Sequence, residues 1–388
     1  MFFNNQTNTD KKRYELLLKI MGSLSRLSSD NDIPFLYYRM AENIFCKAFN
    51  ATNLARSDIS LDAKKENIGI GLKTFINKQS GSIEKIAEFN RSKHLIDADF
   101  TLKNKIKLIS SLRNERLEAT SGITNISTAN MIYHCVLREK DKFIIHEDKI
   151  HPVCIEEISH IKENGNNTIS FFDGIEEYCF NFSKSTLYKR FVSNPIYEIP
   201  IKIFEDPYYI LEKYLTELLN DCNTTLQNRT NEEIQKIYLP LYSQSKSKGY
   251  FVPEKSGLNQ WNANGRTRNI DEVYIPIPAI IRKKFPTFFP DQETSFTLKL
   301  PNGSYLITKI CQANGKALMS NPNSALGKWI LRSVLRLDEG EIATYNKLEK
   351  IGIDTVEISK LSDNTYEINF KKLGTYTEFL TNLMNNYN

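Results

Sequence analysis

The chain lacks the features of membrane-spanning, fibrous and disordered proteins. No stretch approaches the roughly 18 consecutive apolar residues that a membrane span needs. The composition, with 40% hydrophobic and 25% charged residues, 16 glycines and 13 prolines, excludes collagen-like and low-complexity chains. The opening residues are polar where a signal peptide has an apolar core, so we expect no export signal. The length of 388 residues predicts about two to three domains.

Cysteine is also scarce and unpaired in the sequence. The six cysteines lie far apart, and no C-x-x-C pair occurs, which excludes a zinc ribbon. Isolated thiols of this kind are typical of a reduced, cytoplasmic protein. The cysteines are Cys46, Cys135, Cys154, Cys179, Cys222 and Cys311.

Positive charge is concentrated in the last third of the chain. The net charge is only +5, and the first 238 residues hold 32 basic and 32 acidic residues. The segment from Lys246 to Arg336, however, contains 14 basic residues and only 5 acidic ones. A basic block of this length with strand-like patterning favours a phosphate-bearing partner such as a nucleic acid.

The first part of the chain alternates helix and strand signals. Apolar residues recur near every 3.6 positions in two early segments, and Pro34 suits the opening of the second helix. Two short strands follow, joined by a polar turn at 64–67. We expect helices at 11–27, 34–49, 81–91, 102–118 and 206–222, strands at 53–63 and 67–76, and a hairpin at 131–148.

The last third reads as mostly β structure. The run SQSKSKG at 243–249 is typical of a linker. Beyond it, alternating strands broken by turns such as PNG and ANG predict a small barrel. The strands are expected at 272–278, 295–301, 303–312 and 355–361. The domains are therefore predicted at 1–238 and 239–388.

Acidic and lysine side chains come together on the predicted early hairpin. On the first strand Asp58, Ser60 and Asp62 alternate, so they share one face. On the second strand Lys73 shares a face with the glycines before it. Carboxylates that hold a divalent metal and a lysine that orients water suit phosphodiester hydrolysis. An ordinary hairpin with polar residues facing solvent explains the same pattern.

Three further carboxylates border this hairpin. Glu42 lies beside the apolar stripe of the predicted second helix, where a carboxylate needs a metal or lysine partner. Glu84 and Glu88 are one turn apart on the predicted helix 81–91 and would point to one side. A solvated helix face is the alternative for both residues.

Residues 34–92 resemble the α/β core of PD-(D/E)XK nucleases. In that family an Asp closes one strand, and the next strand carries an acidic residue two positions before a Lys. Asp62 or Asp58 would be the first acid and Lys73 the lysine, but Gly71 occupies the place of the second acid. Some members supply this carboxylate from the following helix, which would make Glu88 the substitute.

A second nuclease chemistry uses the pattern H-x-K-x4-D, with the histidine as covalent nucleophile. The chain has one H-x-K, at His160 and Lys162, but Asn167 occupies the position of the aspartate. The segment reads as a helix end and turn, so an exposed helical histidine is the simpler interpretation.

Two clusters in the basic block combine amides, small residues and basic side chains. Asn and Gln pair with adenine edges and Arg with guanine, so flexible arms of this composition suit DNA bases and phosphates. The two tryptophans, Trp261 and Trp329, also fit a role as packing anchors. The candidate DNA-binding residues are Lys255, Asn259, Gln260, Trp261, Asn262, Asn264, Arg266, Arg268, Lys316, Ser320, Asn321, Asn323 and Lys328.

Residues 249–370 resemble the DNA-recognition domain at the carboxy end of several restriction endonucleases, which is related to the plant B3 domain. The resemblance implies a seven-stranded pseudobarrel that sends two arms into the major groove. The run 256–268 would form the first arm and 316–329 the second.

Together the two resemblances imply a type II restriction endonuclease that hydrolyses both strands of duplex DNA and leaves 5′-phosphates. Mg²⁺ would be the cofactor, held by Asp62 with Asp58 or Glu88, while Lys73 assists the water and Glu42 is the next candidate acid. We expect a bacterial, cytoplasmic protein without membrane contact. Its partners would be double-stranded DNA and, genetically, a cognate DNA methyltransferase, and a homodimer stays open. The alternative is a sequence-specific DNA-binding regulator with a degenerate nuclease half.

Overall fold

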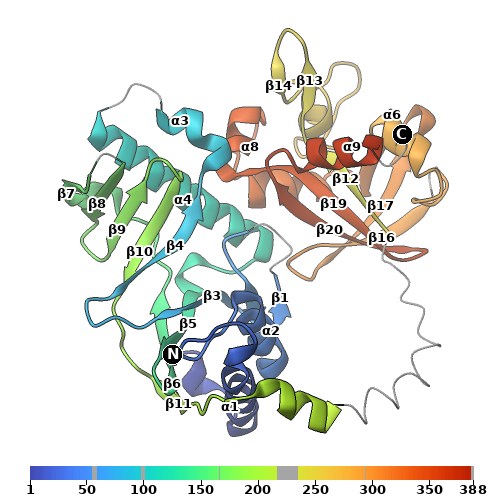
Figure 1. Ribbon diagram of the computed structural model, residues 1–388. Coiled ribbons are helices and arrows are strands. Elements are labelled where there is room, and N and C mark those ends of the chain that lie inside the picture. Colours follow the sequence, from blue (N-terminus) through green and yellow to red (C-terminus); the bar gives the residue numbers. More distant parts are fainter. Residues whose placement is uncertain (55–58, 98–100, 166, 216–234, 293, 386–388) are drawn as a thin grey trace. The chain divides into compact units, whose positions relative to one another are not determined.

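The chain divides into two compact units, and each draws on separate stretches of sequence. The computed structural model describes residues 1–54, 59–97, 101–165, 167–215, 235–292 and 294–385 (Figure 1). The first unit contains 1–56, 61–88 and 127–233, and the second contains 57–60, 89–126 and 234–388. The expected boundary between residues 238 and 239 stays a prediction about independent folding. No described helix is long and apolar enough to cross a membrane.

A six-stranded mixed sheet forms the centre of the first unit, in the order β1-β2-β3-β5-β6-β11. The predicted hairpins at 64–67 and 131–148 are confirmed, with Ala63 opposite Ile70 in the first. β3 runs parallel to β5, so the chain between them crosses over through a long excursion. The strands are β1 Thr52–Asn53, β2 Ala63–Lys65, β3 Ile68–Ile76, β5 Met131–Glu139, β6 Lys142–Lys149 and β11 Tyr197–Pro200.

The helices α1 (Asn8–Ser23) and α2 (Tyr38–Phe49) lie side by side against this sheet (Figure 1). The helices predicted at 11–27 and 34–49 are thus confirmed. The second starts later than expected, because the segment from Pro34 to Tyr37 is extended. Their apolar faces meet the inner face of the sheet in a core that includes Tyr14, Leu18, Phe45, Phe49, Ile70 and Leu72.

A second sheet of the first unit, in the order β4-β10-β9-β8-β7, corrects the prediction for 81–91. This segment is the strand β4 (Ser82–Glu88), which pairs with β10 (Thr186–Phe191). Its apolar residues at 83, 86 and 89 fit a helical period, but pairing with a strand about 100 residues away in the sequence overrides that local preference. The other strands are β7 Ser159–Glu163, β8 Thr168–Phe172 and β9 Glu177–Asn181.

His160 lies on a strand as well, so its predicted place at a helix end is wrong. It sits on β7, is exposed, and has a positive φ of 49° where the pairing with β8 is irregular. Its Nδ1 atom is 3.2 Å from the Ser159 hydroxyl oxygen.

A nearly closed, barrel-like sheet forms the second unit, as predicted from the strand pattern. The order is β12-β19-β20-β16-β17-β18-β15, and β12 also contacts β15 (Figure 1). The strands are β12 Lys236–Pro240, β15 Ile275–Pro276, β16 Ser295–Lys299, β17 Tyr305–Cys311, β18 Ala317–Asn321, β19 Ile353–Ser362 and β20 Thr365–Lys372. The expected linker at 243–249 instead belongs to a hairpin of β13 (Ser243–Ser245) and β14 (Gly249–Phe251).

Helices close the barrel core of the second unit. The longest is α4 (Leu102–Thr124), which was predicted and which contributes Ala119 and Ile123 to this core. The π-helix η9 (Lys328–Val334) contributes Trp329 and Val334. The others are α3 Lys93–Asp97, α6 Ala279–Lys284, α7 Ala325–Gly327, α8 Tyr345–Ile351 and α9 Thr375–Asn385. Of the helix expected at 206–222, residues 207–215 are helical, and the remainder, with Cys222, lies outside the described residues.

Candidate DNA interface and catalytic site

The base of the first predicted arm is fixed by a buried amide. The Asn259 side chain is fully buried; its Nδ2 donates to the carbonyl oxygens of Pro253 (3.0 Å) and Ala343 (2.9 Å). Its Oδ1 accepts the Ala343 N–H at 2.9 Å. With every amide function bonded to backbone, Asn259 supports the arm, and its predicted contact with DNA stays a prediction. Gln260 is half-buried in the same short helix, η7 (Gly257–Asn262).

The tip of the first arm, residues 264–267, is exposed and is shaped by two arginines. Arg268 Nη1 donates to the carbonyl oxygens of Ala263 (2.7 Å), Asn264 (3.2 Å) and Arg266 (3.1 Å), so it folds the loop from inside. Its side chain is only 13% exposed, against 57% for Arg266. Arg266 reaches the buried Glu272 carboxylate with one nitrogen at 2.6 Å. Arg266 therefore presents donors to a ligand, whereas Arg268 holds the turn.

The remaining candidates of the first arm divide in the same way. Lys255 and Asn264 are exposed. The half-buried Asn262 donates its Nδ2 to the Glu254 carbonyl at 3.0 Å. Trp261 packs against the barrel core, and Trp329 lies within it, 5.0 Å from the Phe370 ring centroid. The structure supports packing roles for both tryptophans.

The second predicted arm runs from the end of β18 into η9. Ser320 is buried, and its hydroxyl donates to the Pro322 carbonyl and accepts the Leu326 N–H, both at 2.8 Å. This hydroxyl therefore shapes the arm, and its predicted contact with DNA stays a prediction. The other four candidates are exposed: Lys316, Asn321, Asn323 and Lys328.

The two arms emerge beside each other. The strand that follows the first arm, β15, is antiparallel to the strand that leads into the second, β18, with Ile275 opposite Leu318. Arg332 of η9 donates to Asp271, at the end of the first arm, at 2.7 Å. A Cβ atom at Gly327 would overlap the Asp271 carbonyl oxygen, so the backbones meet directly there. The exposed amides, Arg266 and Lys328 thus gather where β18 leads into η9, whereas Lys316 precedes β18 at the other end of that strand.

This segment has a known counterpart. Residues 229–362 match the profile of the NgoFVII C-terminal B3-like DNA-binding domain family. They are similar to the DNA-binding part of a restriction enzyme. The match supports sequence-specific binding of double-stranded DNA, and it leaves residues 1–228 and 363–388 unmatched. No curated protein matches the chain.

In the first unit, Asp62 and Lys73 lie where β2 stops pairing with β3. The ladder of these strands ends at Ala63 and Ile70. Just beyond it the Asp62 N–H donates to the Ile70 carbonyl (2.9 Å), and Asp62 Oδ2 accepts the Leu72 N–H (2.7 Å). The first strand is thus shorter than predicted: Ser60 and Asp62 precede it, and Asp58 lies outside the described residues.

Glu42 interacts electrostatically with Asp62 and Lys73. Its position beside the apolar stripe of the second helix predicts such a partner. Glu42 is 5% exposed, and Arg39 of α2 donates to its carboxylate at 2.8 Å. Burial, with the Asp62 charge second, raises the pKa of Glu42, while Arg39 and Lys73 lower it. Burial raises the pKa of Asp62 too, opposed by Lys73 and the Leu72 N–H. Two desolvated carboxylates and a lysine therefore share one environment.

Gly71 leaves little room for the missing second acid. A Cβ atom there would lie 3.1 Å from the Tyr133 ring. Lys73 Nζ and Lys189 Nζ lie 5.9 and 5.8 Å from the centroid of this ring. Lys189 is buried between the carboxylates of Asp148 and Glu176. At Gly69 a Cβ would overlap Leu61, so the glycines permit close packing rather than leaving open space.

The carboxylate that the structure brings to Lys73 is Glu84, not Glu88. Burial raises the pKa of Glu84, and Lys73 is the largest influence that lowers it, followed by Arg138. Glu88, at the end of β4, is 45% exposed and pairs with Lys85 at 3.1 Å. The metal role of Glu88 stays a prediction. An error in secondary structure hid the better candidate, because an alternating strand would have aimed Glu84 inward.

The described residues contain no group of three or more His, Cys, Asp and Glu side chains arranged to hold a metal ion. Mg²⁺ needs fewer protein ligands, because it is commonly held by one or two carboxylates with water and substrate phosphates. The oxygen donors of Asp62, Glu42 and Glu84 and their raised pKa values fit such a cation.

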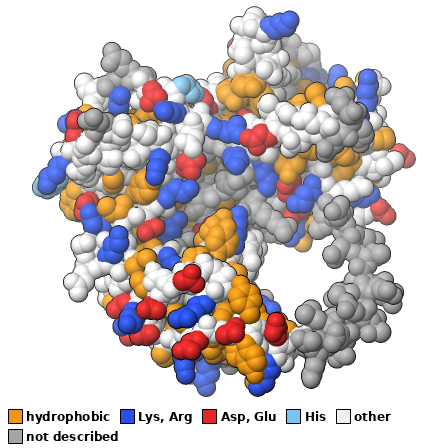
Figure 2. Space-filling model, viewed as in Figure 1, with side chains coloured by type: hydrophobic (Ala, Val, Ile, Leu, Met, Phe, Trp, Pro, Cys, Tyr) orange, Lys and Arg blue, Asp and Glu red, His pale blue; other side chains and the backbone are white. Residues whose placement is uncertain are grey.

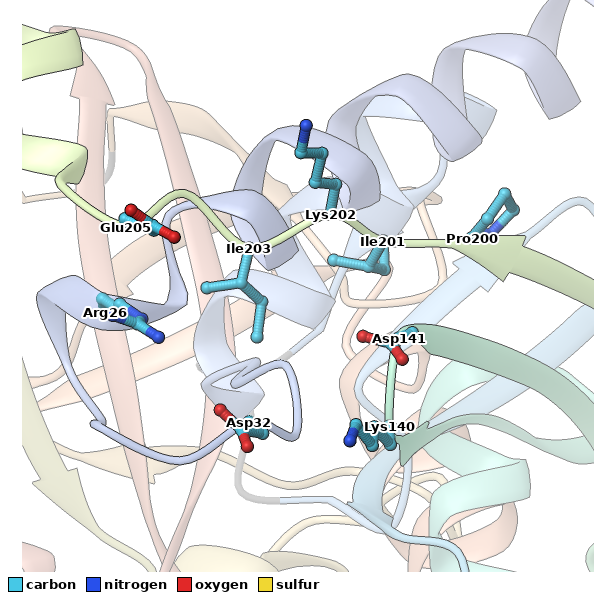
Figure 3. Close-up of a pocket in the computed structure, with 9 residues that line it drawn as sticks. All are labelled: Arg26, Asp32, Lys140, Asp141, Pro200, Ile201, Lys202, Ile203 and Glu205. Carbon is cyan, nitrogen blue, oxygen red and sulfur yellow. The ribbon is translucent and has the colours of Figure 1, made fainter.

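A separate pocket of about 600 Å³ opens elsewhere on the first unit (Figure 3). Three basic and three acidic side chains line the pocket together with apolar residues. Because these charges balance, the pocket has no net positive charge that would attract an anion such as a phosphate. None of the candidate catalytic residues reaches it. On the face shown in Figure 2, acidic and basic side chains are likewise mixed over this unit. The lining residues are Arg26, Asp32, Lys140, Asp141, Pro200, Ile201, Lys202, Ile203 and Glu205.

Proposed function

We propose that the protein is a type II restriction endonuclease that hydrolyses phosphodiester bonds of double-stranded DNA at a specific sequence, with Mg²⁺, and leaves 5′-phosphates. The observation that carries the proposal is the match of residues 229–362 to a restriction-enzyme DNA-binding domain, together with two exposed arms at one end of the barrel. A restriction enzyme needs a catalytic part besides its DNA-binding domain, and the cluster of Asp62, Lys73, Glu42 and Glu84 in the first unit is our candidate for it.

Recognition would use the side chains that the arms leave exposed. Asn321 and Asn323 can pair with adenine edges, and Arg266 with guanine. Lys316 and Lys328 would contact phosphates, as would Lys283 and Lys284 of α6, and these contacts carry affinity rather than sequence information.

Hydrolysis would use the cluster at the start of β2. Asp62 and Glu84 would hold Mg²⁺ with help from Glu42, and Lys73 would orient the attacking water and stabilise negative charge. Bound Mg²⁺ lowers the pKa of its water and neutralises the phosphate. The half-buried setting of these side chains strengthens each electrostatic interaction. Arg39, half-exposed beside Glu42, would contact the scissile phosphate.

The alternative is a sequence-specific DNA-binding regulator whose first unit is a degenerate nuclease. Tyr133 covering Gly71 and the small number of clustered carboxylates among the described residues favour it. The phospholipase-D-type alternative has little support, because the exposed His160 lies on a strand and Asn167 replaces the acid.

Plasmid cleavage by the full-length protein tests the proposal. We expect cutting with Mg²⁺ and none with EDTA. Lys73→Ala should abolish cutting and leave DNA affinity within about three-fold, since base and phosphate contacts lie on the arms. Lys149→Ala, an exposed lysine of β6, is the matched control and should cut like the wild type. Binding without cutting under all metal conditions would establish the regulator instead.

A further inference from the structure

The segment just before Asp62 belongs to the second unit. Ile59 and Ser60 cluster with the barrel and its helices, whereas Leu61 and Asp62 belong to the first unit. Ile59 packs against the barrel core. One candidate catalytic carboxylate thus follows directly on a segment that the DNA-binding unit holds.

Helix α4 holds this segment through two hydrogen bonds to Ser60. The Ser60 N–H donates to Thr120 Oγ1 at 3.1 Å, and Arg113 Nη1 donates to Ser60 Oγ at 3.1 Å. Thr120 and Arg113 are both 2% exposed. The Thr120 hydroxyl also donates to the Arg116 carbonyl at 2.8 Å, so its own proton is committed and its lone pair faces Ser60.

Helix α4 is in turn packed against η9 without intervening side chains. A Cβ atom at Gly122 would overlap the Ser333 carbonyl oxygen, so only glycine allows this approach. Arg336, just after η9, pairs with Glu118 of α4. Ile123 and Val334 lie in the same core. A shift of η9 therefore cannot leave α4 in place.

Both DNA-binding arms end on η9. The second arm continues into it at Lys328, a candidate phosphate contact. The first arm is tied to it by the bond from Arg332 to Asp271. A continuous series of buried contacts thus runs from the arms through η9 and α4 to Ser60, and from there the chain reaches Asp62 in two residues.

We propose that α4 couples DNA recognition to catalysis: binding of the target sequence by the arms fixes η9 and α4, and the bonds to Ser60 then fix the position of Asp62. The proposal rests on the proposed nuclease function. Thr120 is a positioning residue, since it touches neither substrate nor metal. DNA binding reduces the range of positions that η9 and α4 occupy. The range of positions of Asp62 is reduced as well only while Ser60 is hydrogen-bonded to α4.

Thr120→Val removes the acceptor for the Ser60 N–H and keeps the shape of the side chain. We expect kcat on the specific sequence to fall at least about ten-fold, because the Ser60 N–H loses its bond to α4, with the Kd of the duplex unchanged within about two-fold. Thr124→Val is the control: it has the same chemistry one turn away, and its hydroxyl donates only to the Thr120 carbonyl. Equal losses of kcat in both variants, or none in Thr120→Val, would overturn the proposal. If Thr120→Val does not fold, Ser60→Ala removes the other bond to α4, from Arg113 Nη1 to Ser60 Oγ, and should likewise lower kcat without changing Kd.

Hydrogen exchange provides a readout that needs no cleavage. A duplex selected from random sequences by the full-length protein is added, and amide exchange is followed. In the wild type, peptides covering 59–62 and 113–124 should gain protection; in Thr120→Val only 113–124 should gain it. Protection of the arms without any change at 59–62 in the wild type would contradict the coupling. A wild type that shows the protection but never cuts would refute the nuclease function and leave the coupling standing.

Discussion

The two units differ in how far their candidate functional residues are exposed to solvent. The second unit exposes Arg266, Asn321, Asn323 and Lys328 on arms that buried residues such as Asn259 and Ser320 hold in shape. The first unit half-buries Asp62, Lys73 and Glu84 and nearly covers Glu42. Reading a DNA sequence requires donors and acceptors that reach outward, whereas phosphodiester chemistry benefits from charges in a poorly solvated site. Substitutions in the second unit should therefore affect DNA binding, and substitutions in the first unit should affect cleavage.

The largest expected effect is in the first unit. Asp62→Asn keeps an oxygen for the Leu72 N–H but loses the charge, so the strand ends should stay folded. Cleavage should fall more than about 100-fold, since even residues that only support metal ligands are worth about 10- to 100-fold. Single-turnover cleavage measures this effect. Specific binding, followed in the same preparation, should be unchanged; a parallel loss of binding would place Asp62 in the fold rather than in catalysis.

The next effect separates the two carboxylates of β4. Glu84→Gln should lower cleavage about 10- to 100-fold and recover partly with more Mg²⁺ or with Mn²⁺. Glu88→Gln should change cleavage less than two-fold, because its carboxylate is exposed and paired with Lys85. Titration of the metal in both variants decides the matter. Inactivity of Glu88→Gln with normal Glu84→Gln activity would reinstate Glu88 as the metal ligand.

The third effect is in the second unit and concerns its two arginines. Arg266→Ala should relax preference at particular base pairs, at a cost of about 1–3 kcal/mol, and should lower the melting temperature only through the lost ion pair with Glu272. Arg268→Ala should leave the consensus unchanged, lower the melting temperature more and weaken binding to all sequences, because three carbonyls of the loop lose their donor. Selection from random duplexes and thermal unfolding distinguish the two. If Arg268→Ala alone changes the consensus, the contacts to bases have been assigned to the wrong arginine.

A smaller effect is expected at the basic surface. Lys283→Ala removes an exposed charge at the end of α6. Binding should weaken evenly across sequences, and the slope of log affinity against log salt should fall by about one. Binding titrations at several salt concentrations test this. An altered consensus would show that Lys283 reads a base.

The smallest effect is on stability. The raised pKa values of Glu42 and Asp62 mean that the folded protein holds these protons more tightly than the unfolded chain. Without metal, the stability due to these groups is full below their ordinary pKa values and is lost as the pH rises through the raised folded values. Unfolding across this range should show the decline, and Glu42→Gln should flatten it. Added Mg²⁺ should restore stability at neutral pH only. A stability that rises with pH in this window, and does so equally in Glu42→Gln, would contradict the assignment.

Much of both units follows from local sequence. Turn residues and alternating apolar positions predict the barrel strands, and helical spacing predicts α1, α2 and α4. The hairpin that carries Lys73 is predicted for the same reason, and so is the burial of Glu42, since both depend on residues close in the chain. The composition of the two clusters also predicts the arms.

The sequence does not predict features whose structure is determined by residues far apart in the chain. The β4 segment has helical spacing, and only its pairing with β10 makes it a strand that turns Glu84 toward Lys73. Asn259 and Ser320 have the chemistry of base contacts, but their partners are backbone groups brought close by folding. The hydrogen bonds between α4 and Ser60 connect residues 53 or more positions apart in the chain, so no local sequence pattern predicts them.

The most direct test is to ask whether one sequence governs both binding and cutting. The ends produced by the wild type with Mg²⁺ on a plasmid library are sequenced, and the duplexes bound by Lys73→Ala are selected from random sequences. The account predicts 5′-phosphate ends that cluster at one short site, and the same site among the selected duplexes. Ends scattered over unrelated sequences, or no ends from a protein that selects one duplex, would contradict it.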